Sequence, residues 1–209
     1  MAVSMLDARA AIVTVGRWLD GKGWAPATSG NYSMRLDNGN FAVTVSGRHK
    51  GRLTENDIMS VDADGRSLDG KKPSAETALH LALYSSFPDV GAVLHSHSPA
   101  AVGLTRAFPG AYGYLLAGHE MLKALPGVTT HETEVTIPIV DNSQDMAEIE
   151  AAITPRLLAA GAPPAYLIRG HGLYGWGRDM VEAERVIEAI EWMIAAELAE
   201  MGFREGSGR

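Results

Sequence analysis

Residues 90 to 97 read Val-Gly-Ala-Val-Leu-His-Ser-His, and this short stretch says most about how the chain folds. The apolar run from Val90 to Leu94 has the length of a buried β-strand, and His95 and His97 follow it. Because side chains alternate along a strand, two histidines at positions i and i+2 project from the same face. We therefore expect a buried strand whose end presents two imidazoles to one site.

A third histidine stands in a similar setting further along the chain. His171 follows the β-type run Ala165 to Ile168 and lies between Gly170 and Gly172, which allow a close approach of other backbone. Three histidines with one open coordination position are typical of a catalytic zinc site, although the same ligands also suit manganese or iron. The competing interpretation is a set of ordinary, partly buried histidines with backbone partners.

Three other histidines are expected to have structural or solvent-facing roles. His80 falls within the apolar pattern of a helix, where a core or capping histidine is more common than a ligand. His49 and His131 lie in polar segments and are expected to be solvated.

Around the histidine stretch, the sequence predicts helices and strands that alternate along one domain. The expected helices are one capped by Ser4 that stops before Gly23, one capped by Ser74 that ends near Ser86, Pro99 to Arg106, one that starts near Gly118, Asp145 to Ala160, and a long terminal helix through Val181 and Met201. The expected strands are Tyr32 to Leu36 and Phe41 to Val45 as a hairpin, Asp57 to Val61, Val90 to Leu94, Val135 to Val140 and Ala165 to Ile168. We therefore predict a single α/β domain over residues 1–209, with a mixed sheet, a core over about 5–201 and a frayed tail over 202–209.

The composition excludes several classes of function. The 209 residues contain no cysteine, so disulfides, thiolate metal sites and cysteine nucleophiles are excluded. A formal charge of −7 argues against nucleic acid as the main partner, and no apolar stretch reaches the ~20 residues of a membrane span. Asp7 and Arg9 interrupt the N-terminal segment, which does not resemble a secretory signal. We expect a cytoplasmic protein whose partner is a small molecule.

Three segments of small residues have the composition of anion-binding loops. They are Thr-Ser-Gly-Asn at 28–31, Ser-Gly-Arg-His-Lys-Gly at 46–51 and Pro-Ser-Ala-Glu at 73–76, the last at a helix N-terminus. Each is also compatible with a plain turn or cap, and none matches a Walker or dinucleotide glycine loop.

Two glutamates are candidates for proton transfer beside a metal-polarised carbonyl. Glu76 stands near the start of a predicted helix, where a carboxylate also stabilises the helix N-terminus. Glu120 follows Gly118 and His119 and is equally compatible with a solvated position. Spacing along the chain does not choose between the two.

Five segments, in order, resemble the class II aldolase/adducin-head family. They are Thr28 to Ser33, Val45 to Gly47, Pro73 to Glu76, His95 to His97 and Arg169 to Gly172, within a similarity that spans about residues 5 to 200. The resemblance implies an α/β/α sandwich with a mixed, mostly antiparallel sheet, and usually a homotetramer. It implies one Zn²⁺ per subunit on His95, His97 and His171. It also implies a phosphorylated ketose, held through loops that include Asn31, Ser46, Gly47 and Ser74.

Within that family, three further segments resemble the members that dehydrate 5-methylthioribulose 1-phosphate in methionine salvage: Gly118 to Lys123, Ile137 to Asn142 and Gly172 to Gly177. This likeness implies a hydro-lyase, with Glu120 as the principal acid/base, Glu76 as a second carboxylate and Lys123 among the substrate-binding residues. The likeness to aldolases places the acid/base at Glu76 instead, although Ala75 stands where aldolases usually carry a serine that binds phosphate. A sugar-phosphate aldolase or 4-epimerase, and a non-catalytic adducin-like scaffold without metal, are the alternatives.

Overall fold

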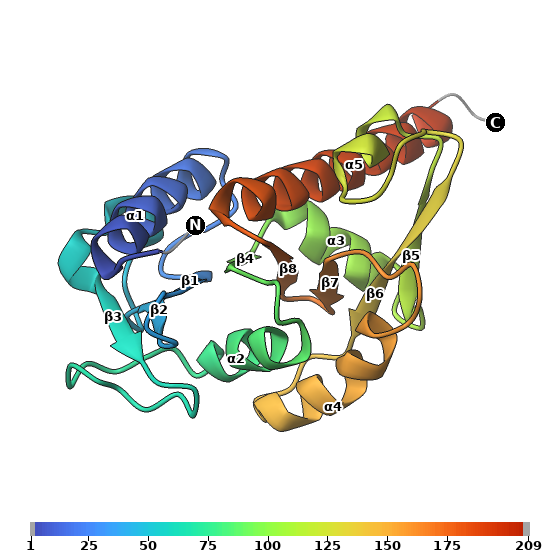
Figure 1. Ribbon diagram of the computed structural model, residues 1–209. Helices are drawn as coiled ribbons and strands as arrows, with labels where there is room; N and C mark the ends of the chain where they lie inside the picture. Colours follow the sequence, from blue (N-terminus) through green and yellow to red (C-terminus); the bar gives the residue numbers. More distant parts are fainter. Residues whose placement is uncertain (1–2, 207–209) are drawn as a thin grey trace.

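The computed structural model describes residues 3–206 and contains a central sheet between two layers of helices (Figure 1). Within those residues the sheet has eight strands, in the order β3-β2-β1-β4-β8-β7-β6-β5. The strands are β1 (Asn31–Arg35), β2 (Phe41–Thr44), β3 (Ile58–Val61), β4 (Ala92–Ser96), β5 (Gly113–Ala117), β6 (Glu134–Val140), β7 (Ala165–Ile168) and β8 (Gly172–Gly177). Neighbouring strands run antiparallel except for the parallel pair β6 and β7.

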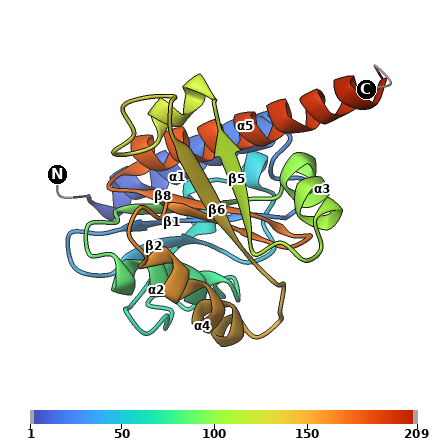
Figure 2. The same cartoon turned by 90° about the vertical axis from the view of Figure 1, so that its right-hand side faces the viewer.

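Helices cover both faces of this sheet. One layer contains α1 (Met5–Gly21), α3 (Pro99–Ala107) and α5 (Met180–Gly206), and the other contains α2 (Thr77–Ser86) and α4 (Met146–Leu157), as Figures 1 and 2 show. Short 3₁₀ helices, η1 (Lys50–Arg52), η2 (Glu55–Asp57) and η3 (Glu120–Ala124), lie in the connections. This arrangement confirms the expected sandwich with a mixed, mostly antiparallel sheet.

Strand β4 lies near the centre of the sheet and is buried on both faces, as its apolar sequence predicts. Ala92 and Leu94 belong to the core that also contains α1, α3 and α5, whereas Val93 belongs to the core beside α2 and α4. By the same alternation, His95 lies on the α2 side of the sheet. The fold thus places the first histidine under the start of α2.

Two strands, β5 and β8, escaped prediction, and in β8 glycine stands where apolar residues are expected. In β8, a Cβ atom added to Gly175 would lie 2.8 Å from Ile187 Cδ1, and one added to Gly177 would lie 2.6 Å from the Ala183 nitrogen. These glycines let α5 pack closely on the strand. Strand β5 is the edge strand of the sheet and begins at Gly113. The sequence predicts neither strand by alternation.

Two predicted helix starts are wrong. The helix expected near Gly118 is only η3, because Gly118 has a left-handed φ of 71° and Pro126 follows soon after. Helix α2 begins at Thr77 with Glu76 in the N-cap position, and the Ser74 hydroxyl accepts a 3.4 Å hydrogen bond from the Glu76 nitrogen without capping the helix.

Helices α1 and α5 lie at the two ends of the described residues. Ser4 caps α1 by accepting a hydrogen bond from the Asp7 nitrogen, as predicted. Helix α5 continues to Gly206, so residues 202–206 of the expected tail are helical, whereas 207–209 lie outside the described residues. No helix in residues 3–206 has the length and apolar character needed to cross a membrane.

Candidate metal centre and adjoining cavity

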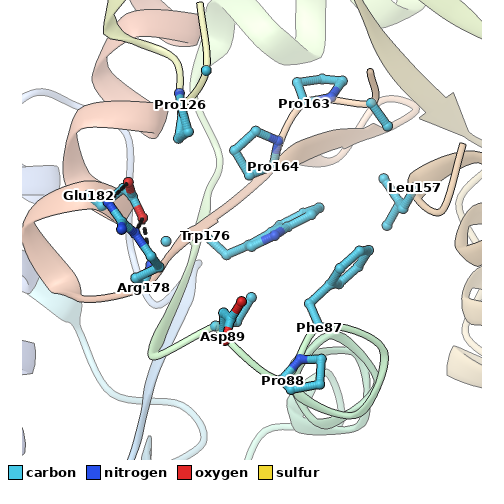
Figure 3. A pocket seen from close by; sticks show the side chains of 14 residues that line it. Phe87, Pro88, Asp89, Pro126, Leu157, Pro163, Pro164, Trp176, Arg178 and Glu182 are labelled. Carbon is cyan, nitrogen blue, oxygen red and sulfur yellow. Dashed lines mark hydrogen bonds and ion pairs between the residues drawn. The ribbon is translucent and has the colours of Figure 1, made fainter. Parts of the chain in front are cut away.

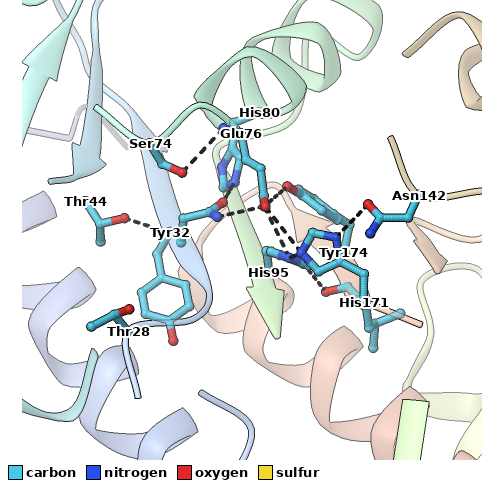
Figure 4. A network of polar contacts seen from close by, with 12 residues as sticks. Thr28, Tyr32, Thr44, Ser74, Glu76, His80, His95, Asn142, His171 and Tyr174 are labelled. Carbon is cyan, nitrogen blue, oxygen red and sulfur yellow. Dashed lines mark hydrogen bonds and ion pairs between the residues drawn. The ribbon is translucent and has the colours of Figure 1, made fainter. Parts of the chain in front are cut away.

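The candidate centre is built across three neighbouring strands. In the sheet register, Asn31 of β1 pairs with His95 of β4, and His95 pairs with Tyr174 of β8. Paired residues direct their side chains to the same face, so an amide, an imidazole and a phenol stand side by side. The His95 ring also stacks on the Tyr174 ring, with centroids 4.0 Å apart. Figure 4 shows His95 and Tyr174 below the start of α2, where Glu76 lies.

His95, His97 and His171 come together as the sequence predicts, with one ligand atom from each within 4.8 Å of the others. His171 lies in the tight turn between β7 and β8, where Gly170 adopts a left-handed φ of 65°. A Cβ atom on Gly172 would lie 2.0 Å from the Ser96 carbonyl oxygen. Glycine at that position is therefore what lets this turn approach the end of β4.

Hydrogen bonds fix the orientation of two of the three imidazoles. His95 Nδ1 lies 3.0 Å from the Leu173 carbonyl oxygen, and His171 Nδ1 lies 3.2 Å from Asn142 Oδ1. Because both partners are oxygen acceptors, the Nδ1 atoms carry the protons and the Nε2 atoms of the neutral rings are left with lone pairs. Those two Nε2 atoms lie 3.3 Å apart. Two lone pairs at this distance repel each other. A cation that binds both lone pairs removes the repulsion, so the donor set fits a divalent metal.

Glu76 adds a carboxylate to the same cluster. Its Oε2 atom accepts hydrogen bonds from Asn31 Nδ2 at 2.9 Å and from the Tyr174 hydroxyl at 2.7 Å. The same oxygen lies 3.2 Å from His95 Nε2, and Oε1 lies 3.3 Å from His171 Nε2. The carboxylate is thus held by its neighbours directly against the predicted metal ligands.

The electrostatic setting favours an ionised Glu76 and neutral rings for His95 and His97. Burial alone would raise the pKa of Glu76, but at low pH the protonated imidazoles of His95 and His171, together with hydrogen bonds from Asn31 and Tyr174, hold that pKa well below its usual range. Burial lowers the pKa of His95 to about 4 and that of His97 to about 3, so both rings are neutral at pH 7. Neutral imidazole is the form that binds a metal ion.

A polar cavity of about 270 Å³ adjoins the centre. Its wall includes Glu76 and His97 together with the three predicted anion-binding segments, represented by Asn31, Ser46, Gly47 and Ser74. Lys50 also lines this cavity and is only 2% exposed. Its ammonium group donates to the Thr28 and Arg48 carbonyl oxygens at 2.9 and 2.6 Å. Burial lowers the pKa of Lys50 to about 8.

Glu120 and Lys123 do not join this cluster within the chain. Both belong to η3, where Glu120 forms ion pairs with Lys123 and with His131, and 68% of its side chain is exposed. The hydrogen bond from Lys123 holds the pKa of Glu120 below its usual value. The predicted roles of these two residues therefore stay predictions.

The histidines outside the centre largely follow the sequence interpretation. His80 is a buried core histidine, with Nδ1 at 2.7 Å from Ser33 Oγ and Nε2 against Asn31 Oδ1. His131 is half-exposed. His49 differs from expectation, because its ring is half-buried and faces Asp20 at 3.9 Å instead of being solvated.

Sequence reasoning did not single out Lys50, Tyr174 or Asn142 as site residues. Lys50 lies in the segment at 46–51, which was predicted to bind an anion because of its small residues. Asn142 and Tyr174 lie in segments that were noted only for their family likeness. Tyr174 stands two residues after Gly172, which follows His171. A strand predicted over these residues would have placed the Tyr174 side chain on the same face as position 172. That strand was hidden by its glycines.

A second, larger cavity, shown in Figure 3, is lined by Trp176 and Gly177, at the end of β8 away from His171. It measures about 610 Å³ and is mainly apolar, with Phe87 and Trp176 stacked at 5.8 Å and the Arg178–Glu182 ion pair beside them. None of the predicted site residues is among its described lining residues. The candidate metal ligands therefore indicate that the smaller, polar cavity is the functional one.

The fold and this site define the class of protein. The model of the family described as Class II Aldolase and Adducin N-terminal domain matches residues 10–198, so the chain belongs to that family. Among solved structures, YgbL from Escherichia coli, a putative aldolase/epimerase/decarboxylase, has a TM-score of 0.77 at 26% identity, with 90% of this chain and 86% of that chain covered. An L-fuculose 1-phosphate aldolase has a TM-score of 0.77 at 22% identity, over 97% and 89% of the two chains, and shows the same fold.

Sequence relatives are more specific. The chain is 50% identical over 192 residues to the methylthioribulose-1-phosphate dehydratase of Methylococcus capsulatus, which covers 91% of this chain and 93% of the relative. It is 52% identical over 188 residues to the enzyme of the same name from Pseudomonas paraeruginosa, over 90% and 91% of the two chains.

Proposed function

We propose that the chain is a zinc-dependent hydro-lyase that removes water from 5-methylthioribulose 1-phosphate in methionine salvage. The observation that carries this proposal is the shared wall of the polar cavity, where His97 and Glu76 meet the three anion-binding segments. A metal centre and a pocket for a charged group thus adjoin each other, as a phosphorylated ketose requires. Half of the residues are identical to those of relatives that carry this activity in their names, which supports the choice of reaction.

The reaction removes a proton from C3 and the hydroxyl from C4 of the substrate. The resulting enol tautomerises to 2,3-diketo-5-methylthiopentyl 1-phosphate. Zinc held by His95, His97 and His171 would supply Lewis-acid stabilisation of charge on the substrate's oxygen atoms, worth several kcal/mol. The protein must then provide groups that accept the C3 proton and donate one to the departing hydroxyl.

Glu120 and Glu76 are the proposed carboxylates, with different tasks. Glu76 is ionised, accepts hydrogen bonds on Oε2 and faces two ligand histidines, which suits it to holding or orienting groups at the metal. Its low pKa makes it a poor proton donor near pH 7. Glu120 is exposed on η3 and is proposed to transfer protons in the site of a neighbouring copy within the expected homotetramer.

The substrate phosphate is proposed to lie in the polar cavity. Asn31, Ser46, Gly47 and Ser74 supply backbone and hydroxyl donors around it. Lys50 adds a buried cation, and two of its three N–H donors are used by carbonyl oxygens, which leaves one for a phosphate oxygen. Lys123 belongs to η3 together with Glu120. A contact between Lys123 and the substrate is therefore proposed along with the role of Glu120.

A product assay with three phosphorylated ketoses tests this function. We expect the purified, zinc-loaded protein to convert 5-methylthioribulose 1-phosphate to the diketone, and to leave fuculose 1-phosphate and ribulose 5-phosphate essentially unchanged. Cleavage of fuculose 1-phosphate would identify an aldolase, and epimerisation of ribulose 5-phosphate an epimerase. A protein without stoichiometric divalent metal and without turnover would be the scaffold alternative. Turnover of dephosphorylated 5-methylthioribulose with similar efficiency would contradict the phosphate pocket.

A further inference from the structure

The structure leaves one metal ligand without a side-chain hydrogen bond. His95 and His171 each have an oxygen acceptor on Nδ1, but the ring of His97 has no such partner among the described residues. Only its backbone is held, by donation from the His97 nitrogen to the Trp24 carbonyl oxygen at 2.7 Å. The ring packs against those of His95 and His171, with centroids 4.5 and 4.6 Å apart, but within residues 3–206 no hydrogen bond to the ring fixes its orientation.

A buried carboxylate lies on the other side of the same segment. Glu191 of α5 is 1% exposed, and its Oε1 atom accepts a 2.6 Å hydrogen bond from Ser96 Oγ. Its Oε2 atom accepts a short hydrogen bond from Ser98 Oγ. Ser96 and Ser98 are the two chain neighbours of His97, so one carboxylate holds the backbone on both sides of the ligand.

Ser98 also joins this segment to the next helix. Its hydroxyl oxygen accepts a 3.0 Å hydrogen bond from the Ala101 nitrogen and so caps α3. The end of β4, the start of α3 and the middle of α5 are therefore fixed to one another around His97. Glu191 forms no ion pair with a cationic side chain within residues 3–206, and burial raises the pKa of its carboxyl group, so an ion pair does not account for its place there.

We propose that Glu191 is a positioning residue for the metal centre, which fixes His97 through Ser96 and Ser98. It acts on the backbone beside a ligand, whereas Leu173 and Asn142 act on the ligand rings themselves. Groups that orient metal ligands commonly contribute 10–100-fold to metal affinity. The inference concerns metal binding, and its test needs no substrate.

The test compares zinc dissociation constants, measured by competition with a chelator, for the wild-type protein and Glu191→Gln. The amide keeps the volume of the side chain but removes its charge and one acceptor oxygen, so one serine must accept from the amide and its own O–H group loses its buried acceptor. We expect the zinc Kd to rise about tenfold or more. Glu188→Gln is the matched control, because Glu188 lies one turn earlier on α5, is half-exposed and pairs with Lys22. Its zinc Kd should equal that of the wild type.

A double mutant separates positioning from a merely structural effect. In a His97→Ala background, Glu191→Gln should leave the residual zinc affinity unchanged, because the residue that it positions is gone. Ser96→Ala removes one of the two contacts and should weaken zinc binding in the same direction, which gives a second variant if Glu191→Gln does not fold. Unchanged zinc affinity in folded Glu191→Gln, or an equal loss with and without His97, would overturn the proposal.

Discussion

Single residues of the centre owe their positions to strand alternation and strand register. The sequence predicts His95 and His97 on one face because that relationship depends only on spacing along one strand. The contacts of Glu76 with Asn31 and Tyr174 depend on which strands are neighbours, and two-residue spacing carries no such information. The cationic Lys50 was missed for a similar reason, since its burial results from packing between two loops.

The two carboxylates should respond differently to removal of charge. Glu76→Gln should lower zinc affinity together with turnover, because the carboxylate lies against His95 and His171. Glu120→Gln should keep zinc and fold but lose on the order of 10²-fold in kcat, the usual scale for a general acid or base. Zinc content and kcat of both variants check this.

Mixing experiments test whether Glu120 acts across a contact between copies. Glu120→Gln and His97→Ala proteins, each with strongly reduced turnover, should regain part of the activity when unfolded and refolded together, because some sites would then contain both intact groups. Near wild-type turnover of Glu120→Gln, with Glu76→Gln dead but fully metal-loaded, would move the acid/base role to Glu76.

At the scale of elements, the sequence predicts best where each element has a regular apolar pattern. The first hairpin, β4, β7 and the long helices α1 and α5 were expected because their periodicities are undisturbed. Strand β8 was missed because Gly175 and Gly177 provide space for α5, a requirement that comes from tertiary packing. Helix α2 starts later than Ser74 predicts, which gives Glu76 the N-cap position above the sheet.

Helix α1 packs closely against η1 through one glycine, which yields a test of element packing. A Cβ atom at Gly16 would lie 2.5 Å from the Lys50 carbonyl oxygen and 3.0 Å from Leu53 Cδ1. Gly16→Ala should therefore overpack α1 against η1 and destabilise the protein by about 1–3 kcal/mol, more than the ~0.5–1 kcal/mol gained from helix propensity. Gly21→Ala, whose Cβ would meet nothing within 4 Å, should be neutral or stabilising. Urea unfolding of both variants measures the difference, and equal stabilities would contradict this packing.

At the scale of the whole molecule, the candidate metal centre joins parts of the chain that are distant in sequence. His95 and His171 are 76 residues apart, and their contact ties the end of β4 to the turn that precedes β8. Backbone pairing also holds these elements beside each other, because β4 and β8 pair along their length. A bound ion should therefore stabilise a site that is already formed.

Zinc should accordingly raise the melting temperature as a ligand of the folded state. Free zinc at 100 times its Kd adds about 2.7 kcal/mol to the free energy of unfolding, if the unfolded chain does not bind it. For a protein of this size that corresponds to a rise in Tm of about 5–10 °C. Thermal unfolding after chelator treatment, with and without added zinc, measures this shift. His171→Ala removes one of the two Nε2 atoms that face each other at 3.3 Å, so its Tm should respond little to zinc. A shift as large in that variant as in the wild type would mean that zinc stabilises the protein at some place other than the three histidines.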